Sequence, residues 1–287
     1  MTATTAPATS ASALPAVLGR FFETKTSCDV AGTMSYFSPS LASYIDATLG
    51  WDFGSYDALK AVFEQYMPGW EPPARSYATR ILAGDTSALV HMTDTPELFG
   101  GELRILAAID VADGKIVRWV DYWDSSAFDT DLYIQFRAPA GAFPADFKDS
   151  QIPTRAASAL VTAATALQQA FGADDAPAAA ELMHTDVVVE DMALRSQVIG
   201  RIESARYLGR VLNQVPYGRS SRLRHIVGGD HGGGFEWTSG PAAGLLAGIT
   251  ALELDPDGLI TKVTSVYDSR QLDPVRKAAL ASASITP

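Results

Sequence analysis

VVVEDMALRSQVIGR, residues 187–201, ends a run of β-branched residues on two acids, Glu190 and Asp191, and reaches a glycine before a helix-like stretch. The same outline occurs earlier in the chain. LASYIDATLGWDFGS, residues 41–55, also runs from apolar residues through an acid, Asp46, to a glycine and a helical pattern. Asp46 and Asp191 are 145 positions apart. This spacing raises the question of whether one structural unit occurs twice.

Two further pairs of stretches keep nearly the same spacing. Asp85 in ATRILAGDTSALVHMT and Asp230 in LRHIVGGDHGGGFEWT are again 145 positions apart. DGKIVRWVDYWDS, residues 113–125, matches DGLITKVTSVYDS, residues 257–269, with an offset of 144, because one residue is lost in the turn. Matched blocks in one order and at one period indicate an internal repeat. The sequence therefore predicts two tandem copies of one domain.

The length of 287 residues agrees with two domains, since a domain averages about 150 residues. A stretch rich in Pro, Gly and Asp separates the two copies and is typical of a linker. We expect a flexible tail at 1–13, a first domain at 14–138, the linker at 139–153, a second domain at 154–275 and a tail at 276–287.

Each copy has the pattern of helices followed by strands. In the first copy, residues 14–25, 28–37 and 55–67 have helical spacing, whereas SYIDATL and four later stretches are typical of strands. The turn at 113–114 is Asp-Gly, which suits a hairpin. Helices that precede a curved antiparallel sheet predict the α+β class, with two tandem cone-shaped domains closed by their N-terminal helices. The hollow inside each cone is the expected pocket.

Charge and composition argue against several classes of function. The net charge is −11 and Lys and Arg form no cluster, so we expect no nucleic-acid partner. No apolar run approaches the roughly 20 residues that span a bilayer, and the N-terminus has neither the basic residue nor the apolar core of a signal peptide, so we expect no membrane partner. Cys28 is the only cysteine, which suits a reducing cytoplasm. A cytoplasmic location is therefore expected.

Four short motifs resemble the nuclear-transport-factor-2-like superfamily, which includes ketosteroid isomerase, limonene epoxide hydrolase and the SnoaL-like polyketide cyclases. They are YIDATLG and VVVEDMALRSQVIGR for the first strand, and DGKIVRWVDYWD and DGLITKVTSVYD for the last strand. In ketosteroid isomerase an acid at the matching end of the first strand is the general base, so the resemblance points to Asp46 and Asp191. Copies in this family pack through their sheets, which implies a pseudo-dimer within one chain and leaves a further homodimer open.

Alternation along the strands extends the candidate site, because successive side chains face opposite sides of a sheet. Tyr44 should therefore share the inward face with Asp46. In the last strand Trp119, Asp121 and Trp123 form one set, and counting from the hairpin turn, as the family does, favours this set as pocket-lining. An acid between two tryptophans lies in an apolar wall, where burial raises its pKa. A second carboxylate nearby then makes one group a proton donor and the other an acceptor.

Other candidate residues come from the middle strands. His91 has Glu236 as its counterpart in the second copy, so both pockets are predicted to hold a titratable group there. Arg104 is predicted to orient a substrate oxygen near Asp121. Simpler structural interpretations stay open: a strand histidine is commonly a core or surface residue, Arg104 suits an exposed cross-strand ion pair, and Asp46 suits a helix cap.

The complete prediction assigns two roles. The catalytic residues are Asp46, Asp121 and His91, and the substrate-binding residues are Tyr44, Arg104, Trp119, Trp123, Asp191 and Glu236. The second copy differs at two matching positions, where Ser265 replaces Asp121 and Tyr267 replaces Trp123. The second pocket is thus predicted to be degenerate or structural, with two pockets acting in sequence as the alternative.

These residues favour an enzyme without a metal or cofactor, since the chain has no Walker loop, dinucleotide fingerprint or His-x-Glu-x-x-His motif. The leading hypothesis is a cyclase or isomerase of secondary metabolism that acts on an apolar, oxygenated, polyketide-like molecule. Asp46 would be the base and Asp121 the acid. An epoxide-opening hydrolase or cyclase of the polyether type is one alternative, although residues 74–77 lack the acid that such enzymes carry. A protein that only binds a small hydrophobic ligand is another, and a scaffold filled by its own aromatics is a third.

Overall fold

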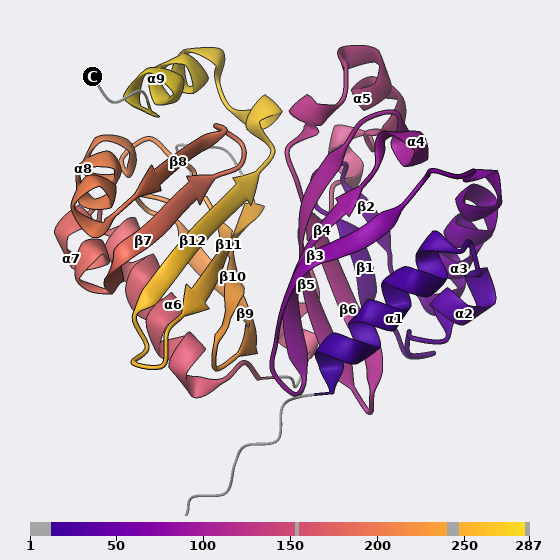
Figure 1. Cartoon of the computed structure of the whole chain (residues 1–287). Helices are drawn as coiled ribbons and strands as arrows, with labels where there is room; N and C mark the ends of the chain where they lie inside the picture. The colour runs from indigo at the N-terminus through magenta and orange to yellow at the C-terminus, as the bar shows by residue number, and fades with distance from the viewer. Residues whose placement is uncertain (1–12, 153–154, 240–246, 285–287) are drawn as a thin grey trace, which may run out of the picture.

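The computed structural model describes residues 13–152, 155–239 and 247–284. The N-terminal half forms one sheet with helices, drawn in indigo and magenta in Figure 1. The strands of this half are β1 (Ser43–Asp46), β2 (Trp51–Phe53), β3 (Ser76–Ala83), β4 (Ser87–Asp94), β5 (Leu103–Ala112) and β6 (Lys115–Tyr122). Its α-helices are α1 (Leu14–Thr26), α2 (Val30–Met34), α3 (Tyr56–Tyr66), α4 (Pro96–Phe99) and α5 (Thr130–Phe136).

The C-terminal half, drawn from pink to yellow in Figure 1, forms the second sheet. Its strands are β7 (Met183–Asp191), β8 (Ser196–Ile199), β9 (Arg222–Gly229), β10 (Gly232–Thr238), β11 (Ala247–Leu254) and β12 (Ile260–Tyr267). Its α-helices are α6 (Ser158–Gly172), α7 (Ala176–Glu181), α8 (Arg201–Val211) and α9 (Pro274–Ser284).

The two sheets have the same strand order. One runs β2-β1-β6-β5-β4-β3 and the other β8-β7-β12-β11-β10-β9, so every strand of the first sheet has a counterpart in the second. The predicted α+β class with two tandem domains is therefore confirmed. One detail of the prediction is wrong: the sheets are mixed rather than wholly antiparallel, because β1 pairs with β6, and β7 with β12, in parallel. A parallel pair needs a long crossover, and α3 with the three strands after it supplies that connection in the first domain.

Local sequence explains where the helices of the first domain begin and end. The Oγ of Ser55 accepts a hydrogen bond from the backbone N–H of Ala58 and caps α3. A 3-10 turn that contains Pro68 follows α3, because proline cannot continue a helix. The carboxylate of Asp29 caps α2 in the same way. This helix is shorter than its predicted range of 28–37, since the chain turns after it to reach the sheet.

The two sheets pack against each other in the middle of the molecule, and α1 to α3 lie on the outer side of the first sheet and α7 and α8 on the outer side of the second (Figure 1). A shared apolar cluster fills the space between the sheets, with Leu82, Leu106 and Val120 from one domain and Val227 and Ile249 from the other. The concave face of each sheet is thus turned towards its own helices. Each domain builds a separate core on that face.

Reciprocal hydrogen bonds also join the two domains. Asp124, which follows β6, accepts a hydrogen bond from the backbone N–H of Ser269 at 2.9 Å. Its counterpart Asp268 accepts one from the hydroxyl of Ser125 at 2.6 Å. Because each acid contacts the residue that follows the other, the contact is symmetric between the two copies. These two acids therefore have structural partners in the interface.

The outer segments of the chain differ in how far the structure describes them. The predicted tail at 1–13 lies outside the described residues except for Ala13. Within the linker at 139–153, the described part includes Phe147, which is buried in the interdomain cluster. The stretch predicted as a C-terminal tail begins inside α9, because Leu280 packs into the second core.

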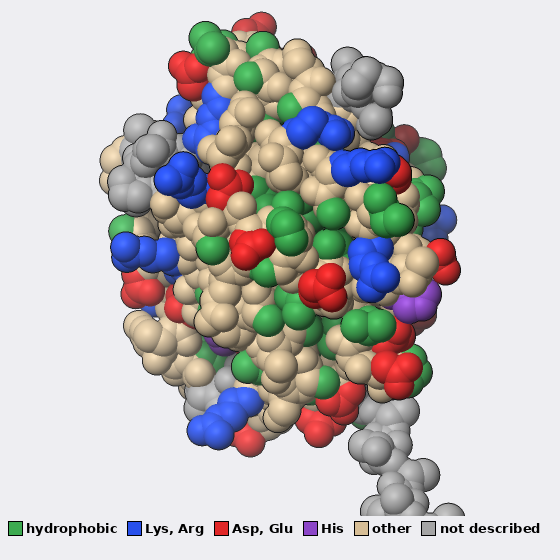
Figure 2. Space-filling model, turned by 90° about the vertical axis from the view of Figure 1, so that its left-hand side faces the viewer, with side chains coloured by type: hydrophobic (Ala, Val, Ile, Leu, Met, Phe, Trp, Pro, Cys, Tyr) green, Lys and Arg blue, Asp and Glu red, His purple; other side chains and the backbone are tan. Residues whose placement is uncertain are grey.

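Figure 2 views the molecule from the side of the second domain, and on this face basic and acidic side chains are interspersed rather than gathered by sign. Among the described residues we find no helix whose length and apolar character would let it span a membrane.

Candidate active site

A cavity of about 80 Å³ lies in the first domain between the helices and the concave face of the sheet. Aromatic and aliphatic side chains from α3, β5 and the segments around them form most of its wall. Four charged side chains also line it: Lys25, Asp46, Asp94 and Asp121. Burial in this wall raises the pKa of Asp46 and of Asp121, which makes these two carboxyl groups candidates for chemistry.

Asp46 and Asp121 lie side by side in this wall. Asp46 ends β1, Asp121 is near the end of β6, and the two residues are partners in the parallel register of these strands. Neighbouring strands are about 4.8 Å apart, and partners in register project from the same face of the sheet. The sequence prediction of two carboxylates from different strands in one hollow thus matches the placement that the structure gives them.

Three hydrogen-bond donors hold the carboxylate of Asp46. Its Oδ1 accepts from the backbone N–H groups of Thr48 at 2.9 Å and Leu49 at 2.8 Å, and its Oδ2 accepts from the indole of Trp123 at 2.9 Å. Burial raises the pKa of Asp46 to about 6 even though these donors favour the ionised form. Asp46 therefore caps the turn after β1, where no helix begins, and also lines the cavity.

Asp121 accepts two hydrogen bonds from aromatic side chains. The hydroxyl of Tyr44 donates to Oδ2 at 2.8 Å, and the indole of Trp119 donates to Oδ1 at 2.6 Å. Burial, followed by the negative charge of Asp46, raises the pKa of Asp121 to about 7. Burial and the charge of Asp121 also raise the pKa of Tyr44, so its hydroxyl stays a donor at neutral pH. The two acids thus differ in pKa, with Asp46 ionising first.

The predicted tryptophans have different positions. Trp123 lines the cavity and contacts Asp46. Trp119 is buried behind the cavity wall, where its ring stacks on Tyr44 at a centroid distance of 5.6 Å and contacts Phe21 at 5.2 Å. Its contribution to the site is the hydrogen bond that orients Asp121.

His91 and Arg104 do not reach the cavity, which corrects their predicted placement. Both line a groove on the opposite face of the sheet, towards the second domain. Asp94 lines the cavity three residues after His91 on β4, so alternation turns His91 the other way. Arg104 stands between two cavity-lining residues of β5, and its side chain is 73% exposed and paired with Glu102. The simpler interpretation of Arg104 as an exposed ion pair therefore holds, although its partner Glu102 precedes it in the same segment and does not lie across the sheet.

Burial lowers the pKa of His91 to about 4, with further lowering by the charges of Lys262 and Arg80. His91 is therefore neutral at physiological pH.

Glu236, like His91, faces the interface between the domains. It is fully buried between the two sheets, where it accepts hydrogen bonds from the guanidinium of Arg118 at 2.8 Å and the hydroxyl of Tyr122 at 2.6 Å. Its position on β10 corresponds to that of His91 on β4, so the same alternation applies to both residues. The predicted pair of titratable groups belongs to the interface side of the sheets.

Two charged residues of the cavity were missed by the sequence analysis. Lys25 ends the buried face of α1 and Asp94 ends β4, and they form an ion pair with a distance of 3.8 Å between Nζ and Oδ1. Helical spacing from Leu18 and Phe21 could have placed Lys25 on the buried face. Alternation from Met92 could likewise have placed Asp94.

The second domain holds one buried acid at the matching place. Asp191 accepts hydrogen bonds from the hydroxyls of Tyr217 at 3.1 Å and Tyr267 at 3.3 Å, and burial raises its pKa to about 7. Its partner in the register of β7 and β12 is Ser265, whose hydroxyl is bonded to Thr250. No second carboxylate therefore lies beside Asp191 in this register.

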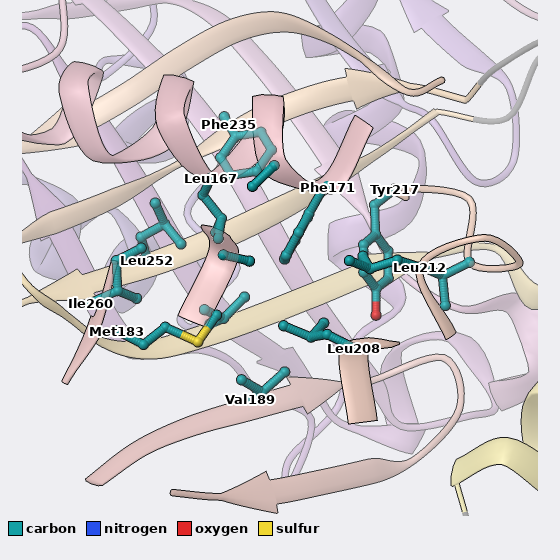
Figure 3. Packing of buried hydrophobic residues seen from close by; sticks show 14 of the residues in the cluster. Leu167, Phe171, Met183, Val189, Leu208, Leu212, Tyr217, Phe235, Leu252 and Ile260 are labelled. Atoms are coloured by element: carbon teal, nitrogen blue, oxygen red, sulfur yellow. The ribbon is translucent and has the colours of Figure 1, made fainter. Parts of the chain in front are cut away.

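Large side chains fill the concave side of the second sheet. Figure 3 shows Phe171, Tyr217, Leu208, Leu212 and Phe235 converging in one packed cluster. The ring of Tyr217 lies within contact of Phe171, Trp237 and Tyr267, with centroid distances between 5.6 and 6.1 Å. On this side of the second sheet the side chains thus form a packed hydrophobic core. Among the described residues of both domains, no group of three His, Cys, Asp or Glu side chains is placed to hold a metal ion.

Comparisons with known proteins find similarity only among solved structures. No protein-family model matches the chain, and no curated protein matches it in sequence. One similar structure is an uncharacterised protein with a cystatin-like fold from Silicibacter pomeroyi, with 20% identity and a TM-score of 0.37 over 44% of this chain and 84% of that chain. Another is a steroid delta-isomerase from Pseudomonas aeruginosa, with 15% identity and a TM-score of 0.36 over 46% of this chain and 90% of that chain.

A SnoaL-like protein of unknown function from Burkholderia thailandensis is also similar, with 12% identity and a TM-score of 0.34 over 39% of this chain and 97% of that chain. The structures to which the chain is similar thus include proteins described as SnoaL-like and as a steroid isomerase. Each match spans less than half of this chain and most of the other protein.

Proposed function

We propose that the first domain is an acid–base catalyst that isomerises or cyclises a small, apolar, oxygenated molecule of the polyketide-like class. The observation that carries this proposal is the in-register pair of Asp46 and Asp121 in one cavity wall. Their pKa values of about 6 and about 7 leave one group ionised and the other partly protonated near neutral pH. One carboxyl group can then accept a proton while its neighbour donates one.

The proton transfers follow from the hydrogen bonds of the two groups. The carboxylate of Asp46, ionised and held by three donors, removes a proton from a carbon next to a substrate carbonyl. The electron pair of the broken C–H bond moves into the C=C bond of an enol, and protonated Asp121 gives its proton to the carbonyl oxygen. Where a second C=C bond is conjugated with the enol, Asp46 returns its proton to the far carbon of that dienol and Asp121 takes back the proton of the hydroxyl, which restores the carbonyl and completes an isomerisation. Attack of the enol carbon on a second carbonyl instead closes a ring, while Asp121 takes back the proton of the enol hydroxyl and Asp46 gives its proton to the new alkoxide.

The cavity limits the size of the substrate. Pockets for drug-sized ligands measure about 300 to 1,000 Å³, whereas this cavity measures about 80 Å³. A compact substrate of about one ring is therefore the proposed fit, and a larger one requires movement of the half-buried aromatic residues of the wall, such as Tyr66 and Trp70.

The exchange of carbon-bound protons tests the reaction directly. Cyclohexanone in deuterated water has exchangeable protons next to its carbonyl, and NMR follows their loss. We expect the protein to accelerate this exchange and Asp46→Asn to reduce the acceleration by about 10² to 10⁴, the usual contribution of a general base. Asp57→Asn, an exposed acid on α3, is the matched control and should leave the rate unchanged. Full exchange by both Asp46→Asn and Asp121→Asn would reject the proposal.

A second candidate is a protein that binds such a molecule without chemistry. The three donors to Asp46 favour it, because they give this acid a complete structural role as the cap of a turn. Under this alternative, cyclohexanone binds but its protons exchange no faster than in buffer. The same experiment therefore separates the two functions.

A further inference from the structure

The proposed proton transfers leave two charged residues of the cavity without a role. Lys25 and Asp94 are 5% and 3% exposed, and both line the cavity that contains Asp46 and Asp121. Burying a charge costs free energy unless a partner compensates it. This second pair of charged groups in a mostly apolar wall therefore needs an explanation of its own.

The contact between the two side chains is incomplete. Their separation of 3.8 Å is longer than a hydrogen bond, which spans about 2.7 to 3.2 Å. Within the described part of the chain, Oδ1 of Asp94 accepts no hydrogen bond at all. The carboxylate thus lacks a donor, and the ammonium group of Lys25 lies too far away to supply it.

A third group in the cavity can complete both contacts. One oxygen atom can lie about 2.8 Å from both Nζ and Oδ1 when these are 3.8 Å apart. A hydroxyl suits this position because it accepts a hydrogen bond from the ammonium and donates one to the carboxylate. A carbonyl only accepts, so it would leave Asp94 without a donor, and a methyl group would satisfy neither residue.

We infer that the Lys25–Asp94 pair is a hydroxyl-binding subsite, and that the substrates are compact ketones with a hydroxyl group away from the reacting carbonyl. The ketone in this inference rests on the proposed function, whereas the hydroxyl rests on the pair alone. The subsite also explains how an apolar cavity could orient a substrate, since a second polar contact fixes which carbon faces Asp46.

Pairs of ligands that differ in one group test the subsite by binding. The probes are 3-hydroxycyclohexanone and 4-hydroxycyclohexanone. Each is compared with the methylcyclohexanone that carries its methyl group at the same ring position. NMR titration measures the four dissociation constants. An apolar wall alone favours methyl over hydroxyl, whereas hydrogen bonds to charged groups should make at least one hydroxyl compound bind about tenfold tighter than its methyl counterpart.

The variant Lys25→Met/Asp94→Leu removes both charges together, because removing one partner alone would leave a buried unpaired charge. In this variant we expect the preference for hydroxyl to reverse to a preference for methyl. The control Glu203→Gln/Arg206→Gln removes an exposed ion pair on α8 and should keep the wild-type preference.

Each outcome decides the inference independently of the reaction. Methyl compounds that bind at least as tightly as both hydroxyl compounds in the wild type would overturn the subsite, as would a hydroxyl preference that persists in the double variant. The proton exchange of unsubstituted cyclohexanone reports the proposed function separately. If the wild type does not accelerate the exchange of cyclohexanone protons but still prefers hydroxyl over methyl compounds, the catalytic proposal is rejected and the subsite is kept.

Discussion

Asp46 and Asp121 show how similar residues acquire different roles from their surroundings. Asp121 is buried and Asp46 is partly buried on the adjacent strand, and desolvation raises both pKa values. Three donors, two of them backbone N–H groups, stabilise the ionised form of Asp46, whereas Asp121 has two donors and faces the charge of Asp46. The result is a base that ionises first and an acid that keeps its proton to higher pH.

This order of ionisation predicts a bell-shaped pH dependence for the exchange of ketone protons. The rate should rise as Asp46 ionises with a pKa of about 6 and fall as Asp121 loses its proton with a pKa of about 7. Exchange rates measured from pH 4 to pH 9 on the wild type check both limbs. A rate that climbs without a fall up to pH 9 would show that protonated Asp121 is not required.

At the scale of elements, strand alternation decides which residues face the cavity, and close backbone packing joins the two sheets on their other faces. β4 turns Asp94 inwards and His91 outwards, and β5 does the same for Ile105 and Arg104. The faces of the two sheets that are turned away from their helices and towards each other come close at the ends of the strands. A Cβ atom at Gly229 of β9 would lie 2.2 Å from the carbonyl oxygen of Ala83 at the end of β3, so the contact requires glycine.

Gly229→Ala should therefore destabilise the protein. The added methyl group meets backbone rather than a flexible side chain, and overpacking of this kind costs about 1 to 3 kcal/mol of unfolding free energy. Urea denaturation measures the change. Gly19→Ala on α1 is the control, because a Cβ there meets nothing within 4 Å and alanine favours a helix. Equal stability of the Gly229 variant and the wild type would contradict the close contact.

At the scale of the whole molecule, a buried polar network joins the two domains. Arg118 of β6 donates to Glu236 of the second domain and to Asp110 of its own domain, and all three side chains are fully buried. His225 approaches Asp110 at 2.9 Å from the second domain, and hydrogen bonding with Asp110 raises its pKa against the effect of burial. Such a network makes the position of each domain depend on the other.

Glu236→Leu should lower the unfolding free energy by about 3 to 5 kcal/mol, because it leaves part of a buried guanidinium unpaired. Lys262 and Glu190 form an ion pair at 3.0 Å in the same sheet, and both side chains are about one-third exposed. Glu190→Leu is the matched control and should cost less than about 1 kcal/mol. Guanidinium denaturation followed by tryptophan fluorescence compares the two variants. Similar losses of unfolding free energy in the two variants would show that the buried network stabilises the protein no more than the partly exposed ion pair does.

Much of the fold was predictable because it depends on repeating local patterns. The period of 145 residues identified two copies, and apolar spacing with the Asp-Gly turn located most helices and strands of the first domain. The parallel pairing of β1 with β6 was not predicted, since residues 75 positions apart carry no local signal of their relative direction.

The candidate site was predictable only in part. The family resemblance pointed to Asp46 and favoured the strand face that carries Asp121 and Trp123, and alternation placed Tyr44 beside Asp46; all four line the cavity. His91 and Glu236 were misplaced because their strands are buried on both faces, so apolar neighbours on either side could not indicate which face meets the cavity. Lys25 and Asp94 were overlooked because a charged residue at the end of a helix or strand resembles an ordinary surface residue.

The sequence by itself determined that the chain contains two copies of an α+β domain and that the first copy has an acid pair which the second lacks, since repeat spacing and residue identity are written in the chain. Only the tertiary structure decided which residues form the interface between the two sheets, whose packing the family resemblance had implied, and that a lysine and a third acid join the pair in the cavity. The physical reason is that a cavity wall and an interface are made by residues from distant segments, whose contacts depend on how whole elements pack.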